Sequence, residues 1–186
     1  TDKKVEFFIL NGAECEPYLT SDYRSMLEYT DRIVSGVKII MKILKAEQGF
    51  VGIEDNKKDA IEIMEKAFQG TGVQVVSLPT KYPQGAEKML IKVLTGREVP
   101  SGRLPMDVGA VVQNVGTCIA VSDAVERGIP LIQRVTTLSG GALKEPKNLL
   151  LRIGTTFKYA IDLCGGFKEE PVKIVMGGPM MGFAKS

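Results

Sequence analysis

Residues 11–18, with the sequence NGAECEPY, carry two carboxylates two residues apart, those of Glu14 and Glu16. Pro17 biases the backbone of Glu16 toward an extended conformation, so both carboxylates are expected to project to the same side and to face one cleft. An apolar strand is predicted just before them, and open α/β sheets bind ligands beyond the carboxyl ends of their strands. Gly12 would let the backbone approach a ligand closely there. The alternative is a solvated acidic loop.

Four sequence blocks resemble a known family. Residues 11–26, NGAECEPYLTSDYRSM, resemble the segment after the first core strand in the C subunit of Rnf electron-transport complexes. More distantly, they resemble the N-A-D-E-S-E-P segment of the flavin-carrying, NADH-binding subunit of respiratory complex I. Three further blocks agree in the same order, and they are residues 82–88 (YPQGAEK), 113–117 (QNVGT) and 176–182 (MGGPMMG). Because these blocks span nearly the whole chain, the chain resembles a fragment of that subunit.

The resemblance implies an activity for the intact subunit. It would be an NADH-dependent oxidoreductase of the NADH:ferredoxin type, passing hydride from NADH to FMN and electrons on to 4Fe-4S clusters. In the family, the glycine-rich flavin loop lies before this segment and the cluster cysteines lie after it. The fragment alone is therefore expected to be inactive and to bind FMN weakly or not at all. Its expected partners are the other subunits of a membrane-bound Rnf-type complex, which would hold it at the cytoplasmic face of the membrane.

The family pattern also implies which residues of the first block bind cofactors. Asn11 matches an Asn that contacts the flavin in the complex I relative. Glu16 matches a Glu beside the dinucleotide, so it is the candidate for holding NADH through hydroxyl or amide hydrogen bonds. Gly12 and Glu14 belong to the same set of candidates.

The second block resembles a Y-x-x-G-x-E pattern whose members flank the flavin and the nicotinamide in that relative. Its matching residues are Tyr82, Gly85 and Glu87. Gly85 would permit close backbone approach, and Tyr82 could stack or donate from its hydroxyl. An ordinary turn leading into a helix is the alternative.

In the third block, Gln113 and Asn114 match an Asn-Asn pair that lies near the FMN phosphate or ribityl chain in that relative. Thr117 follows them and is a further candidate. A strand-to-helix turn suits phosphate binding, but Asn114 could equally be a plain N-cap. In the fourth block, residues 177–179 (GGP) resemble a phosphate cradle only superficially, because no Lys-Ser or Lys-Thr follows. A tight turn is predicted there.

A different class of function fits the same family resemblance. The chain could be a non-catalytic docking or ligand-binding module of an Rnf-C-like electron carrier or of a cobalamin-reductase-like protein. NADH kinetics of the full-length subunit with a changed Glu16 or Tyr82 would distinguish the two classes.

Hydrophobic periodicity predicts an α/β fold with a Rossmann-like parallel sheet. The predicted strands are residues 5–10, 49–54, 73–78 and 108–112. The predicted helices are residues 22–45, 57–68, 86–94 and 114–127, and the first of these regions could hold one helix or two. Residues 20–22 offer N-cap side chains. No G-x-G-x-x-G sequence is present, so a conventional dinucleotide site at the first turn is not supported.

The order of the predicted elements changes after residue 133. Strands are predicted at residues 134–138, 149–153 and 172–176, with a helix at 155–164. This order resembles the small β-grasp, or soluble-ligand-binding, domain that follows the flavin domain in the family. The expected domains are therefore a Rossmann-like FMN/NADH-binding domain, 1–133, and a β-grasp domain, 134–186.

Composition excludes several classes of function. A net charge of +2 with interspersed acids and bases leaves no basic stripe for nucleic acid. The most apolar stretch, residues 33–44, contains Lys38 and Lys42 and is too short to insert into a membrane. The chain has no His and three widely spaced Cys, so neither a metal site nor a disulfide framework is indicated. The cysteine usage indicates a reduced, cytoplasmic chain.

Overall fold

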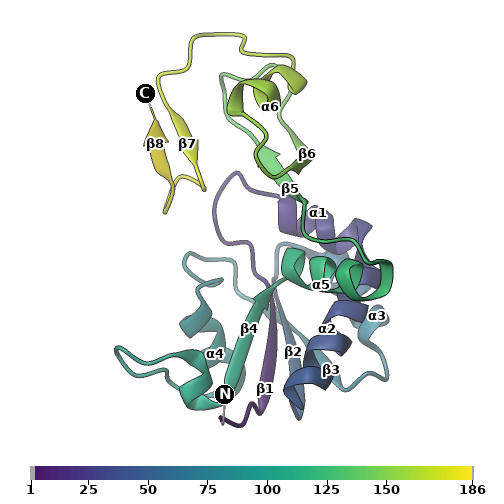
Figure 1. The fold of residues 1–186 in the computed structure, drawn as a ribbon. Coiled ribbons are helices and arrows are strands. Elements are labelled where there is room, and N and C mark those ends of the chain that lie inside the picture. The colour runs from purple at the N-terminus through teal and green to yellow at the C-terminus, as the bar shows by residue number, and fades with distance from the viewer. Residues whose placement is uncertain (1–2, 186) are drawn as a thin grey trace.

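The computed structural model describes residues 3–185, and a four-stranded parallel sheet with its flanking helices forms the larger part of them (Figure 1). The strand order is β3-β2-β1-β4, with bounds β1 Phe7–Gly12, β2 Gln48–Glu54, β3 Val73–Leu78 and β4 Ala110–Asn114. Each neighbouring pair of these strands is parallel. The Rossmann-like sheet predicted from alternating apolar strands and helices is confirmed.

Helices cover the two faces of the sheet unequally (Figure 1). One face carries α1 (Ser21–Glu28), α2 (Thr30–Leu44), α3 (Lys58–Phe68) and α5 (Val115–Arg127). The other face carries α4 (Glu87–Thr95) and the short 3₁₀ helix η1 (Pro105–Val108). The helical region predicted at 22–45 is therefore two helices, which was one of the two expected alternatives.

The predicted bounds of the fourth strand were wrong. Residues 105–108 form η1, which ends at Gly109 with a φ of 73°. Such a left-handed residue stops a helix and lets the chain change direction, so the strand begins only at Ala110. It then runs on to Asn114, two residues past the predicted end.

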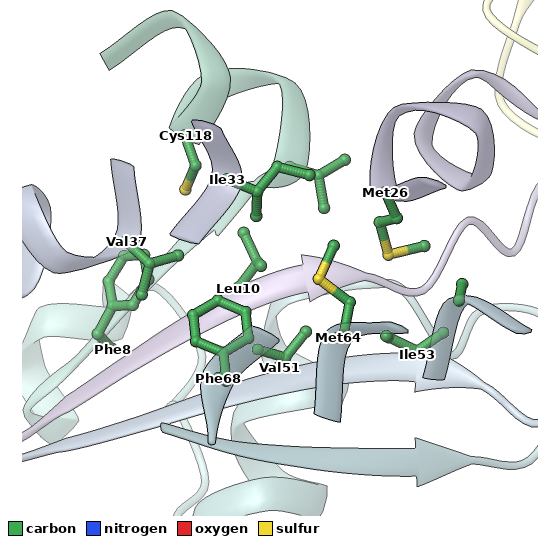
Figure 2. Packing of buried hydrophobic residues seen from close by; sticks show 12 residues of the cluster. Phe8, Leu10, Met26, Ile33, Val37, Val51, Ile53, Met64, Phe68 and Cys118 are labelled. Carbon is green, nitrogen blue, oxygen red and sulfur yellow. The ribbon is translucent and has the colours of Figure 1, made fainter. Parts of the chain in front are cut away.

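Side chains of β1 alternate between two apolar clusters, as the pleat of a central strand requires. Phe8 and Leu10 are fully buried on the side of α2, α3 and α5, where Figure 2 shows Ile33 above Leu10. Ile9 is fully buried on the opposite face, against Leu90 of α4. Burying each such side chain contributes about 1.5–3 kcal/mol, so β1 anchors both halves of the core.

Gly36 sets the distance between α2 and α5. A Cβ atom added there would lie 2.0 Å from the carbonyl oxygen of Cys118 in α5. No side chain fits that space, so the two helices touch through their backbones. The glycine inside α2 therefore permits close packing of the two helices.

The second part of the chain contains two small antiparallel sheets. Its elements are β5 (Gln133–Leu138), β6 (Lys147–Arg152), α6 (Phe157–Leu163), β7 (Ile174–Met176) and β8 (Phe183–Lys185). β5 pairs with β6, and β7 pairs with β8. The strand β8 was not predicted. Figure 1 shows this part beyond the carboxyl ends of the parallel strands, with the β7–β8 hairpin standing apart from α6.

Hydrogen bonds join the second part to the loop that precedes α1. The backbone N–H of Thr20 donates to the hydroxyl of Thr137 at 3.1 Å. The amide nitrogen of Asn148 donates to the hydroxyl of Thr20 at 2.9 Å. β5 and β6 are thereby attached to the first part close to the predicted site. Among residues 3–185, no helix combines the length and the apolar character that a bilayer span requires.

Candidate functional site

The carboxyl edge of the parallel sheet brings together residues from three of the predicted blocks. Asn11 and Asn114 are register partners at the ends of the adjacent strands β1 and β4. The Asn11 side chain reaches the loop before α4, where its Nδ2 donates to the carbonyl oxygen of Gly85 at 2.9 Å. Asn11, Gly85 and Asn114 therefore share one edge, although more than a hundred residues separate the first from the last.

Gly85 lies tightly against the loop that follows β1. A Cβ atom at this position would lie 2.1 Å from the carbonyl oxygen of Ala13 and 3.2 Å from Sγ of Cys15. The close approach predicted for Gly85 is thus made to the protein's own backbone. Tyr82, in the same loop, is 39% exposed.

The amino end of α4 follows directly after this loop. Its N-cap residue is Ala86, which has no side-chain acceptor for the free N–H groups of the first turn. Glu87 is the first residue of the helix and its side chain is exposed. These uncapped amides are donors suited to an anion.

Glu14 caps α1. Its carboxylate accepts from the Ser21 hydroxyl at 3.0 Å and from the backbone N–H groups of Asp22 and Tyr23, both at 3.1 Å. The N-cap residue, Thr20, makes no side-chain capping bond, so the expected local cap is replaced by a carboxylate from the preceding loop. These donors also fix the direction of the Glu14 side chain.

The Glu16 side chain points toward the turn between β7 and β8. One oxygen of its carboxylate accepts from the backbone N–H of Met180 at 3.0 Å, and the other accepts from that of Met181 at 2.9 Å. The expectation that Glu14 and Glu16 face one cleft is therefore wrong. The strand alternation that would align them does not continue past Gly12, where β1 ends.

Gly12 also serves the protein's own packing. A Cβ atom at this position would lie 2.8 Å from Sδ of Met26 in α1 and 3.1 Å from the carbonyl oxygen of Gly52 in β2. The absent side chain thus lets α1 pack over the end of the sheet.

Asn114 forms the N-cap of α5, which was the plainer of its two expected roles. Its Oδ1 accepts from the N–H of Gly116 at 2.8 Å, and its Nδ2 donates to the carboxylate of Asp22 at 2.7 Å. Gln113, the partner of Leu10 in the sheet, and Thr117, in the first turn of α5, are both half-buried nearby.

Two acidic residues at this edge were not among the predicted site residues. Burial, and next the negative charge of Glu14, raise the pKa of Asp22 to about 6. Glu54, at the end of β2, is only 3% exposed, and burial likewise raises its pKa. Asp22 was expected only to offer an N-cap side chain, and Glu54 only to end a strand. A polar residue ending a buried strand was the available signal for Glu54.

A cavity of about 300 Å³ lies next to Asn114, between α1, α5 and the segment leading into β5. Asp22, Tyr29 and Arg134 line it together with apolar side chains. Of the predicted site residues, only Asn114 lines this cavity.

In open parallel sheets of this kind ligands bind at the carboxyl edge, and here that edge gathers amide, carboxylate and free N–H groups. The chain belongs to the Nuo51 FMN-binding domain family, whose sequence model matches residues 1–123. Residues 135–184 match the model of the SLBB domain.

Two relatives are similar to this chain over nearly its whole length. It is 82% identical over 185 residues to the C subunit of the proton-translocating ferredoxin:NAD(+) oxidoreductase complex of Clostridium ljungdahlii. It is 53% identical over 182 residues to the C subunit of the Na(+)-translocating ferredoxin:NAD(+) oxidoreductase complex of Acetobacterium woodii. These matches cover 100% and 97% of this chain but only 40% and 41% of the relatives, so the chain spans about two fifths of their length. The resemblance predicted from four sequence blocks is confirmed.

Solved structures support the fold independently. Crystal structures of an NAD+-reducing NiFe-hydrogenase in the H2-reduced and air-oxidized states align with TM-scores of 0.69 and 0.72. The alignments cover 87% and 88% of this chain and 33% of each hydrogenase chain, at 19% sequence identity. At this identity the likeness shows a shared fold.

Proposed function

We propose that this chain forms the FMN- and NADH-binding part of an electron-transfer subunit that oxidises NADH. The observation that carries the proposal is the convergence of Asn11, Gly85 and Asn114 on the carboxyl edge of one parallel sheet. Membership of the Nuo51 FMN-binding domain family and 82% identity to a subunit named for ferredoxin:NAD(+) oxidoreductase activity support it.

The residues at the sheet edge fit a flavin nucleotide in their chemistry. The uncapped N–H groups at the start of α4 suit its phosphate, and Tyr82 suits its ring by stacking or hydrogen bonding. Asn11 retains one free amide hydrogen after bonding Gly85. The other residues assigned to FMN in this proposal are Gly12, Glu14, Gln113, Asn114 and Thr117.

NADH is assigned to the carboxylates of Glu16 and Glu87, which would accept hydrogen bonds from its hydroxyl or amide groups. When bound, FMN supplies the redox chemistry by accepting hydride from NADH and releasing electrons. The residues of this chain would orient the two molecules against each other. They would also limit the access of water.

The proposal extends to the intact protein. There, electrons pass on to 4Fe-4S clusters outside residues 1–186, and the subunit assembles with others of a membrane-bound Rnf-type complex at the cytoplasmic face. The division of this chain into a flavin domain, 1–133, and a β-grasp domain, 134–186, is part of the same proposal. The start of β5 at Gln133 supports that boundary.

The test uses the full-length subunit with bound FMN. Glu16→Gln should raise the KM for NADH roughly tenfold, because a charged acceptor is replaced by a neutral one. Tyr82→Phe should lower the flavin content or slow the bleaching of the flavin by NADH. Glu65→Gln, on the exposed face of α3, and Tyr159→Phe, on the exposed face of α6, make the same chemical changes elsewhere. Wild-type flavin content and NADH kinetics in both site variants would instead favour a docking or ligand-binding module.

A further inference from the structure

The turn between β7 and β8 binds the carboxylate of Glu16, a residue that lies 164 positions before Met180 in the sequence. The turn is closed by one hydrogen bond, from the N–H of Gly182 to the carbonyl oxygen of Gly178, at 2.8 Å. Within it, the N–H groups of Met180 and Met181 each donate to a different oxygen of Glu16. Consecutive backbone amides of this kind form a concave anion site, and here the anion is a side chain of the first domain.

Gly178 fits this contact for two reasons. Its φ is 96°, a left-handed conformation that residues with a Cβ atom adopt only with strain. A Cβ atom there would also lie 2.7 Å from Oε2 of Glu16. The Gly-Gly-Pro sequence was predicted only to form a tight turn. Its second glycine also leaves room for the Glu16 carboxylate.

Two hydrogen bonds leave the carboxylate able to accept more. An ionised carboxylate offers about four acceptor positions, two on each oxygen. The turn uses one position on each oxygen, so one on each remains for the hydroxyl groups of a ligand. Bonds from N–H groups to a charged oxygen are strong, and they restrict the rotation of an otherwise flexible Glu side chain. A side chain held in advance loses less freedom when a ligand binds.

From this geometry we infer that the β7–β8 turn is a positioning element for Glu16 and sets the affinity of the first domain for NADH. The inference rests on the proposed function, in which Glu16 accepts hydrogen bonds from NADH. Met180 and Met181 do not touch the ligand in this account. Their backbone N–H groups act through Glu16, so the small domain contributes to substrate binding without contacting the substrate.

The decisive variant is Gly178→Ala in the full-length subunit with bound FMN, because the added methyl group would meet the Glu16 carboxylate and disturb its contact with the turn, while the carboxylate itself is retained. Its expected effect is a rise of about fivefold in the KM for NADH, with kcat and flavin content unchanged. Amide hydrogen exchange at Met180 and Met181 should become faster in the same variant. Gly166→Ala is the matched control, since Gly166 also has a positive φ, of 79°, but no neighbour within 4 Å of an added Cβ.

If Gly178→Ala does not fold, Gly182→Ala opens the same turn from its other end. A Cβ atom there would lie 2.3 Å from the carbonyl oxygen of Gly178. A lower KM for NADH in either variant would mean that the turn competes with NADH for Glu16, and the inference would be overturned. An unchanged KM for NADH together with faster amide exchange would mean that the contact stabilises the turn without affecting NADH binding, and this result would also overturn the inference.

Glu16→Gln separates a failure of this inference from a failure of the proposed function. If Glu16→Gln leaves the KM for NADH unchanged, Glu16 does not bind NADH, and both the assignment and the inference fall. If Glu16→Gln raises the KM while Gly178→Ala does not, only the positioning role of the turn is lost. Faster amide exchange at Met181 in Glu16→Gln would show that the carboxylate holds the turn, whatever the NADH kinetics.

Discussion

The side-chain nitrogen of Asn11 donates a hydrogen bond at 2.9 Å to the carbonyl oxygen of Gly85, a residue 74 positions further along the chain. The Asn11 oxygen meanwhile accepts from the N–H of Ala13 at 3.1 Å. A single amide side chain thus shapes the loop after β1 and fastens it to the loop before α4. The candidate cofactor edge depends on this pairing of two loops, and so do several measurable properties of the protein.

Gly85→Ala should separate the two loops. The added methyl group would lie 2.1 Å from the carbonyl oxygen of Ala13, which belongs to the backbone and has little room to move. We expect the free energy of unfolding to fall by about 2 kcal/mol, as measured by urea denaturation. Gly141→Ala, with no neighbour within 4 Å of its Cβ and no positive φ, should change it by less than about 0.5 kcal/mol. Equal stability of the two variants would contradict the close contact.

Glu14→Ala should weaken the start of α1. The substitution removes the acceptor for the Ser21 hydroxyl and for the N–H groups of Asp22 and Tyr23. Loss of a helix cap costs about 1–2 kcal/mol, and we expect a decrease of that size in the free energy of unfolding. Glu65→Ala, at an exposed position of α3, is the control and should have almost no effect. Indistinguishable denaturation midpoints would argue against the capping role.

Asp22 should make the protein less stable as the pH rises through the weakly acid range. Its pKa is raised from 3.8 to about 6, chiefly by burial, so the folded protein binds this proton more tightly than the unfolded chain does. The stabilisation is complete below about pH 4 and is lost as the pH approaches 6. Asp22→Asn stays neutral, so its free energy of unfolding relative to wild type should increase by roughly 2–3 kcal/mol between about pH 4 and pH 7.

The measurement is urea denaturation of both proteins at several pH values. Other carboxylates titrate in the same range, but they are common to both proteins and cancel in the difference. Asp31→Asn, at an exposed position of α2, serves as the control and should keep the pH dependence of the wild type. A difference between wild type and Asp22→Asn that does not vary with pH would exclude a raised pKa for Asp22.

The three thiols should differ in reactivity. Cys118 and Cys164 are fully buried, and burial raises the pKa of both, that of Cys118 to about 12. Cys15 is half-buried in the loop after β1. Alkylation of the native protein at about pH 8, followed by peptide mass spectrometry, should modify Cys15 first and Cys118 only after unfolding. Labelling of Cys118 in the native state would show that α2 and α5 separate more readily than their packing indicates.

The order of the elements followed from the sequence because each signal is local. The apolar strand at residues 73–78 and the helical spacing around Ile33 depend on neighbours within a few residues. Alternation of such strands with helices then leaves few topologies besides a parallel sheet. Three of the four family blocks placed the candidate residues after strand ends, and such ends meet at one edge of a parallel sheet. Asn11 and Asn114 could therefore be expected to lie together.

The sequence by itself thus determined the sheet, its helices and the edge that carries Asn11, Gly85 and Asn114. Only the tertiary structure decided where the two carboxylates point. Alternation along a strand fixes side-chain directions only while the strand lasts, and β1 ends at Gly12. Beyond that residue each carboxylate turns toward whichever donors the fold brings near, which are the start of α1 for Glu14 and the β7–β8 turn for Glu16. No local pattern encodes a partner that lies 164 residues away.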